Sequence, residues 1–231
     1  MDRPILDSSL QFDGPRSPKE SEFKKLLEFL DANLRKGNEW SIAREYPTAL
    51  SLGNLHNIRM VTDGEEICSH AVLKPLIVKT PLLPIKVGAI GSVVTESSHR
   101  NKGLSKKLLE DCLGLAQKQD CDVAILWTNL YDFYRKLGFE LAGTEMSFVV
   151  ENEFRGPLHH LRFIEDNKIS PDALLRIYMQ HTVTTHRSAE EVRKFMQIPN
   201  TRIYSAWDSV GSLAAYAIEG KGADLSGYIH E

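Results

Sequence analysis

The feature that most constrains the fold is a change of hydrophobic period between residues 85 and 118. Residues 85–95 (IKVGAIGSVVT) are rich in apolar and β-branched residues, which favour a strand. From residue 101 onward, Leu104, Leu108 and Cys112 recur at helical spacing. We therefore predict a strand over 85–95 that leads through a polar turn into an amphipathic helix over 101–118.

The turn between these elements has the composition of an anion site. The first turn of a helix has backbone N–H groups without internal partners and the positive end of the helix dipole. Gly103 allows a phosphate to come close to the backbone, Arg100 and Lys102 add positive charge, and Ser105 can donate a hydroxyl. The pattern predicts a pyrophosphate site at residues 100–105. A solvated surface turn with no ligand is the alternative reading.

Two motifs in this region resemble those of one protein family. Residues 100–105 (RNKGLS) resemble the R/Q-x-x-G-x-G/A acetyl-coenzyme A motif of the GNAT superfamily of N-acetyltransferases, and residues 133–139 (FYRKLGF) resemble its F-Y-x-K-L-G-F signature. The expected helix, strand and short helix lie between them in the same order. The resemblance covers roughly residues 20–150 and implies an α/β fold, with a mixed sheet flanked by helices.

The resemblance also implies roles for individual residues. In the family, the strand before the motif splays at a bulge and its backbone pairs with the pantetheine arm, which here implies Val93, Val94 and Thr95. Tyr134 corresponds to the tyrosine that protonates the leaving thiolate, with Tyr131 as a fallback and a purely packing role as the alternative. The backbone amides expected to hold the pyrophosphate are those of Arg100, Asn101, Lys102, Gly103, Leu104 and Ser105.

The implied activity is transfer of acetyl from acetyl-coenzyme A to an amine of a small molecule or peptide. Many family members place a glutamate on the strand before the motif as the base, but residues 85–95 contain no carboxylate. Glu96, His70, a water relay and a more distant residue therefore stay open as acceptors of the amine proton. A non-catalytic acyl-coenzyme A sensor or interaction module is the alternative function.

The rest of the first 150 residues predicts an alternation of helices and strands. Residues 1–16 predict an irregular arm, and Ser17 predicts the cap of a helix that ends at Gly37. The domain boundary is expected at residue 150, with a domain over 17–150. The other predicted elements are a short helix near 41–50, strands over 56–62 and 67–78 joined by an Asp63-Gly64 turn, a strand over 123–127, a helix over 130–137 and an extended segment over 139–150.

Residues 151–231 predict a partial repeat of the opening, in the order helix, helix, hairpin. Helices are expected over 171–181 and 187–197, the second capped by Ser188, and strands over 202–207 and 212–219. In this alignment Ile58 matches Ile203, Asp63 matches Asp208, and Ala71-Val72 matches Ala217-Ile218. A tandem or enlarged architecture with a degenerate second half is one interpretation, and chance similarity is the other. Whether this half is complete stays open.

Composition excludes some classes of function. The net charge of −3 with no dominant basic tract argues against a nucleic-acid or anionic-membrane binder. The odd count of three cysteines, the polar N-terminus and the lack of a long apolar run favour a cytoplasmic protein with reduced, buried thiols. Adjacent His159 and His160 point apart, so no metal site is expected. Oligomeric state cannot be inferred.

Overall fold

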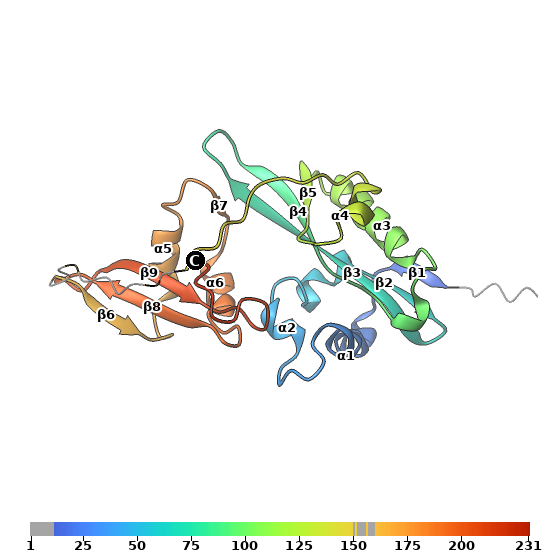
Figure 1. Cartoon of the computed structure of the whole chain (residues 1–231), viewed down its shortest axis with the longest axis horizontal. Coiled ribbons are helices and arrows are strands. Elements are labelled where there is room, and N and C mark those ends of the chain that lie inside the picture. The colour runs from blue at the N-terminus through green and yellow to red at the C-terminus, as the bar shows by residue number, and fades with distance from the viewer. Residues whose placement is uncertain (1–11, 150, 152–155, 157–159) are drawn as a thin grey trace, which may run out of the picture. The chain divides into compact units, whose positions relative to one another are not determined.

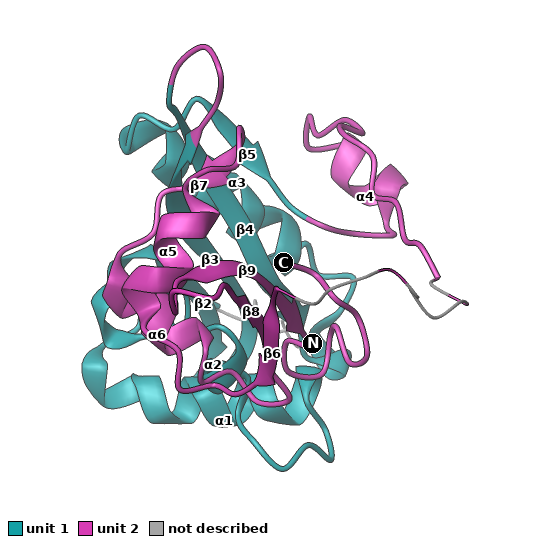
Figure 2. Cartoon of the chain, turned by 90° about the vertical axis from the view of Figure 1, so that its left-hand side faces the viewer, with its two compact units in different colours: residues 1–78, 84–126 teal, residues 79–83, 127–231 magenta. Residues whose placement is uncertain are grey.

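The computed structural model describes residues 12–149, 151, 156 and 160–231, which fall into two compact units. Unit 1 comprises residues 1–78 and 84–126, and unit 2 comprises residues 79–83 and 127–231 (Figure 2). Each unit is described separately. The predicted domain boundary at residue 150 stays a prediction.

Unit 1 is built on a mixed sheet with the strand order β1-β2-β3-β4-β5 (Figure 1). The neighbours from β1 to β4 pair antiparallel, and β4 pairs with β5 in parallel. The crossover between these parallel strands is the predicted helix over 101–118. A mixed sheet with helices on it is therefore confirmed. The strands are β1 (Asp13–Arg16), β2 (Ile58–Asp63), β3 (Glu66–Lys79), β4 (Ile85–Thr95) and β5 (Val123–Ile125).

Helices cover both faces of this sheet. Side chains alternate along β2, so neighbouring residues of this strand contact different helices. Met60 lies in an apolar core with Leu26 and Leu30 of α1, and all three are fully buried. Arg59, on the opposite face, pairs with Asp111 of α3. The helices are α1 (Phe23–Leu34), α2 (Ile42–Glu45) and α3 (Leu104–Lys118), with 3₁₀ turns η1 (Glu20–Glu22), η2 (Leu52–Asn57) and η3 (Ser97–His99).

The start of the chain differs from the prediction at two points. Residues 13–16 are not an irregular arm but form β1, which pairs with β2. The first helical turn begins at Glu20, with Lys19 as its cap, because the Ser17 hydroxyl is bonded to the carbonyl of His56 and to Arg59. Ser17 therefore anchors the chain to the sheet and does not cap the helix.

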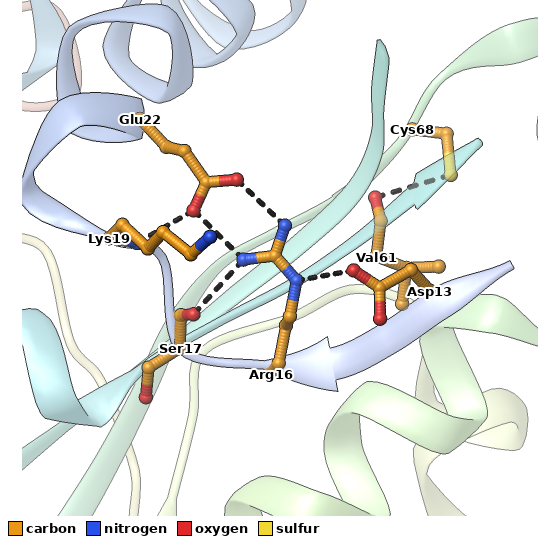
Figure 3. Close-up of polar contacts among 7 residues, drawn as sticks. All are labelled: Asp13, Arg16, Ser17, Lys19, Glu22, Val61 and Cys68. Atoms are coloured by element: carbon orange, nitrogen blue, oxygen red, sulfur yellow. Dashed lines mark hydrogen bonds and ion pairs between the residues drawn. The ribbon is translucent and has the colours of Figure 1, made fainter. Parts of the chain in front are cut away.

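An ion-pair network joins β1 to the first helical turn (Figure 3). The two terminal nitrogens of Arg16 lie 2.8 and 2.7 Å from the two carboxylate oxygens of Glu22, and its Nε donates to Asp13. The backbone N–H of Lys19 donates to the same Glu22 carboxylate at 2.7 Å. These hydrogen bonds, Arg16 first, lower the pKa of Glu22 to about 2.

The burial of the three free cysteines of unit 1 was only partly predicted. Cys68 and Cys112 are buried, and burial raises their pKa values to about 11 and about 12, so both are neutral thiols near pH 7. Cys121 is partly exposed, which corrects the expectation that all three thiols are buried. Its place at the C-terminal end of α3, after the last helical turn, explains the exposure.

Unit 2 contains the sheet β6-β8-β9, in which all neighbours pair antiparallel. Its core includes Leu174, Val192 and Ile203. The predicted cap is confirmed, since Ser188 and Glu191 form a capping box at the start of α6. The elements are α4 (Tyr131–Arg135), β6 (Arg162–Glu165), α5 (Pro171–Tyr178), β7 (Thr184–Thr185), α6 (Ala189–Phe195), β8 (Arg202–Trp207) and β9 (Leu213–Glu219).

The hairpins of the two units have equivalent pairing at the aligned positions. Ile58 pairs with Val72 in unit 1, and Ile203 pairs with Ile218 in unit 2. Two helices precede the hairpin in each unit, as the sequence pattern predicts. A common origin of the two halves stays a prediction.

The extended segment predicted over 139–150 is not a strand within its described part, residues 139–149. Gly143 adopts a left-handed backbone conformation, with φ at 74°, which interrupts an extended chain. No described strand supplies backbone partners to this segment. Its apolar side chains are consequently exposed, with Phe148 82% and Val149 85% accessible. No helix of the described chain has the length and apolar character needed to span a membrane.

We predict that Glu22→Gln lowers the free energy of unfolding by about 1.5 kcal/mol at pH 7, because it breaks charge-assisted bonds to Arg16. The pKa of Glu22 is depressed in the folded protein, so this stabilisation is complete above about pH 4.5 and is lost as the pH falls toward about 2. Denaturant unfolding at several pH values measures both effects.

Glu28→Gln is the matched control, because Glu28 pairs with Lys24 at 3.9 Å on the exposed side of α1. We expect a change within about 0.5 kcal/mol for this variant. Equal losses in the two variants would contradict the role given to Glu22.

Candidate functional site

In the described part of the chain, one edge of β4 is unpaired over the second half of the strand. The parallel pairing with β5 runs through three residue pairs, from Val87 with Val123 to Ala89 with Ile125. Beyond Ala89, β4 continues to Thr95 with a partner on the β3 side only. Among the described residues, the backbone groups of the far half of β4 that face away from β3 therefore have no strand to pair with. Such an edge can receive a ligand that carries amide groups.

A β-bulge lies within this unpaired half of β4. The register passes from Val72 opposite Gly91 to His70 opposite Val94, so one residue of β3 faces two of β4. Ser92 has φ at 49°, the left-handed region that non-glycine residues rarely adopt. A bulge re-aims the strand beyond it. The resemblance implied a bulge in this strand and assigned the backbone groups that pair with the ligand to Val93, Val94 and Thr95. The structure has a bulge at Ser92 and Val93, and the assignment of the ligand contacts stays a prediction.

The strand then enters a short turn that exposes the start of α3. Gly103 caps the helix with φ at 75°, and a Cβ added there would meet no atom within 4 Å. The first intrahelical bond runs from the N–H of Lys107 to the carbonyl of Gly103. The three preceding amides of α3 have no acceptor within the helix. Open space at a helix N-terminus with free amides suits a phosphate group.

A chain of hydroxyl groups ties β3, β4 and α3 together. The Ser69 hydroxyl donates to the carbonyl of Val94 at 3.1 Å and lies 2.7 Å from the Thr95 hydroxyl. The Thr95 hydroxyl lies 2.7 Å from that of Ser105. Because Ser69 gives its only proton to a carbonyl, Thr95 must donate to Ser69 and Ser105 must donate to Thr95.

This order bears on the prediction that Ser105 donates its hydroxyl to a phosphate, which stays a prediction. A hydroxyl that donates to Thr95 has no proton left for a phosphate. The contribution left to Ser105 is its backbone N–H, together with the bond that fixes the start of α3 on the end of β4. A hydroxyl at this position therefore supports the geometry of the turn.

Positive charge surrounds the turn, as the sequence predicts. Arg100, Asn101 and Lys102 are exposed. The Nε of Arg100 donates to the carbonyl of Thr95 at 3.3 Å, which holds the guanidinium near the turn. The ammonium of Lys102 lies 5.6 Å from the centre of the Phe12 ring, a cation–π distance. Two cations at the mouth of a helix N-terminus strengthen its attraction for an anion.

Tyr134 belongs to unit 2, whereas the predicted cofactor-binding residues belong to unit 1. It is buried, with 9% of its surface exposed, and its ring contacts Phe133 and Phe139 edge to face at 5.0 and 5.9 Å. Burial raises the pKa of Tyr134, so the phenol keeps its proton at neutral pH. Tyr131 is 50% exposed and lacks this environment.

Neither predicted candidate for the base has a pKa suited to that role. His70 is fully buried, and burial lowers its pKa to about 4. The pKa of Glu96 is lowered by hydrogen bonds from Ser97 and Asn33. A base that works near neutral pH needs a pKa near that pH. A water relay and a more distant residue are the alternatives that stay open. His159, one of the two histidines set aside as metal ligands, lies outside the described residues.

Two contributors to this geometry were missed at the sequence level. Ser69 begins the hydroxyl chain, and His70 donates to the carbonyl of Ser92 across the bulge. The available signal was the pair of polar residues inside the apolar strand over 67–78. A buried polar residue in a central strand needs a hydrogen-bond partner, so the pair marked a place where the sheet is irregular.

Comparison with known proteins agrees with this architecture. A sequence search finds no match among curated proteins. The structure is similar to a protein from Enterococcus faecalis V583 described as a probable N-acyltransferase, with a TM-score of 0.64 and 13% identity over 90% of this chain and 55% of that one. A GCN5-related N-acetyltransferase from Anabaena variabilis gives a TM-score of 0.63 at 14% identity, over 93% of this chain and 56% of that one.

A third match is the GCN5-related N-acetyltransferase from Kribbella flavida, with a TM-score of 0.60 and 13% identity, over 92% of this chain and 56% of that one. The chain thus spans about half the length of these proteins, and at such identities the likeness concerns the fold alone. The family model of the acetyltransferase (GNAT) domain matches residues 15–142, more than half of the chain. The unpaired edge of β4, its bulge and the free first turn of α3 all lie within the matched residues. The chain belongs to the GNAT acetyltransferase family.

Proposed function

We propose that this protein is an acyl-coenzyme A dependent N-acyltransferase that moves acetyl from acetyl-coenzyme A to an amine of a small molecule or peptide. The observation that carries the proposal is the continuity of the unpaired edge of β4 with the free first turn of α3. One extended ligand with amides at one end and a pyrophosphate at the other matches this surface. Acetyl-coenzyme A has that order of groups.

The cofactor contacts follow from the two ends of this surface. We assign the pantetheine arm to the backbone of Val93, Val94 and Thr95, which lies past the last β4–β5 pair. We assign the pyrophosphate to the segment Arg100–Ser105, where Gly103 leaves open space beside the backbone. Backbone amides bind both groups in this scheme, so side-chain identity matters less than the conformation of the turn.

The proposed reaction is direct attack of the acceptor amine on the thioester carbonyl. A C–N bond forms, the C–S bond breaks, and the sulfur leaves as a thiolate that takes the phenolic proton of Tyr134. The nitrogen of the new amide loses its surplus proton to water. The neutral attacking amine arises by loss of one proton from its ammonium form to water. Tyr134 is neutral and buried, which supports its assignment as the acid. It regains its proton from solvent after release of the products.

A second candidate function is an acyl-coenzyme A sensor without turnover. The observation in its favour is the low basicity of Glu96 and His70, the two side chains predicted as candidate bases. Catalysis remains the leading proposal because an amine that is already neutral needs no protein base. We place the protein in the cytoplasm, a proposal supported by its free cysteines.

We predict that Tyr134→Phe lowers kcat about 10²-fold or more with a small change in acetyl-coenzyme A affinity, because it removes the proton donor and keeps the ring. The measurement is thiol release from acetyl-coenzyme A with a panel of small amines and peptides. Tyr131→Phe is the matched control on the same helix, and we expect nearly wild-type turnover. Full activity in Tyr134→Phe would remove it from this role, and binding without turnover on any amine would favour the sensor.

We predict that Gly103→Glu abolishes acetyl-coenzyme A binding, because a carboxylate would occupy the proposed pyrophosphate position. Gly103→Gln has the same bulk and the same left-handed backbone cost of about 1 kcal/mol without the charge, so it separates the charge from strain. Ser105→Ala keeps the backbone amide but removes the hydroxyl bond to Thr95 that fixes the start of α3, so we expect the Kd to rise about 10-fold, which corresponds to about 1.4 kcal/mol. Isothermal titration calorimetry measures all three. Unchanged affinity in Gly103→Glu would refute the placement.

A further inference from the structure

Among the described residues, the His70 side chain makes one hydrogen bond, and this bond crosses the bulge in β4. The imidazole is 0% exposed, and its Nδ1 lies 2.8 Å from the carbonyl oxygen of Ser92. A carbonyl oxygen only accepts, so Nδ1 carries the proton and Nε2 is the unprotonated nitrogen. Nε2 has no hydrogen-bond partner among the described residues. The neutral state is consistent with a pKa that burial lowers to about 4.

The geometry explains why a polar side chain is kept in this place. Apart from the bulge, the residues near His70 on its face of the sheet are apolar: Met60 lies opposite on β2, Val94 lies opposite on β4, and both pack against the α1 core. A histidine here loses its hydration and gains one hydrogen bond, to the residue with a positive φ. Its presence is therefore best explained by what it does to Ser92.

Ser92 needs such a contact to stay in its conformation. A left-handed backbone is unfavourable for serine, and the Ser92 carbonyl lies at the register shift between β3 and β4, where regular ladder pairing is interrupted and another donor is needed. The Nδ1–H of His70 supplies that donor from the adjacent strand. Removal of the donor would favour a regular strand, in which residues 93–95 shift by one position relative to β3.

We propose that His70 is a positioning residue whose Nδ1–H holds Ser92 in the bulge and thereby presents the edge of β4 to the pantetheine arm of the cofactor. The inference rests on the proposed function, since it needs that arm to lie on residues 93–95. It gives His70 a role in cofactor geometry and not in accepting the amine proton. The start of α3, where the pyrophosphate is assigned, is held separately by the Ser69–Thr95–Ser105 hydroxyl chain.

The test compares two ligands that share the pyrophosphate end. Acetyl-coenzyme A carries the pantetheine arm, and 3′-phospho-ADP lacks it. The measured quantity is the ratio of their Kd values, determined by isothermal titration calorimetry on the full chain. For His70→Leu, which removes the donor and keeps an apolar fit, we expect the Kd of acetyl-coenzyme A to rise about 10-fold and that of 3′-phospho-ADP to stay within about 2-fold.

Three further variants separate the hydrogen bond from general packing. His70→Asn places an N–H close to the position of Nδ1, so we expect a nearly wild-type ratio. His70→Gln places its N–H near the position of Nε2, away from Ser92, and should behave as His70→Leu does. The comparison of His70→Asn with His70→Gln keeps the test valid if the leucine variant does not fold. Met60→Ala perturbs the same core without touching the bond, and it should leave the ratio unchanged.

The possible results are distinct. A wild-type ratio in both His70→Leu and His70→Gln would overturn the positioning role. An equal loss for both ligands would also overturn it, because it would show a general structural effect. If neither acetyl-coenzyme A nor 3′-phospho-ADP binds to the wild type, the proposed cofactor site is refuted, and the inference with it. A loss confined to acetyl-coenzyme A and restored in His70→Asn is the result that we expect.

Discussion

The architecture of unit 1 depends on one change in the pairing of β4. As far as Ala89 this strand is paired on both edges, and beyond it the β5 edge is free among the described residues. A central strand with an unpaired edge is costly unless a ligand or water satisfies its polar groups. The same strand leads directly into the open first turn of α3. The free edge and the free amides are thus consecutive parts of one chain segment.

Two sets of polar contacts keep this segment from closing into a regular sheet. The hydroxyl chain from Ser69 through Thr95 to Ser105 fixes the end of the strand to the helix. The bond between His70 and Ser92 holds the bulge before it. Both sets start on β3, which is buried at the centre of the sheet. The central strand β3 therefore fixes the conformation of the unpaired end of β4 and of the start of α3.

The sequence predicted those parts of the fold that rest on strong local patterns. The bounds of β4 were predicted correctly because an apolar run meets a glycine-containing polar turn, and α3 followed from its spaced leucines. The start of α1 and the nature of residues 139–149 were mispredicted. In the first case Ser17 bonds to the distant His56, and in the second no strand is at hand to pair with. Long-range partners decide both, and local propensity does not contain them.

For the site, the motif predicted which residues form the turn but not which groups of these residues are bonded within the protein. The hydroxyl bond of Ser105 to Thr95 and the bond from His70 to Ser92 depend on residues in other elements, which the motif does not contain. In the proposed function, one segment, Val93–Ser105, binds acetyl-coenzyme A through its backbone. The direct test is amide hydrogen exchange with and without acetyl-coenzyme A. We expect slower exchange at Val93–Thr95 and Arg100–Ser105 on binding. Protection elsewhere, with exchange in these two stretches unchanged, would contradict it.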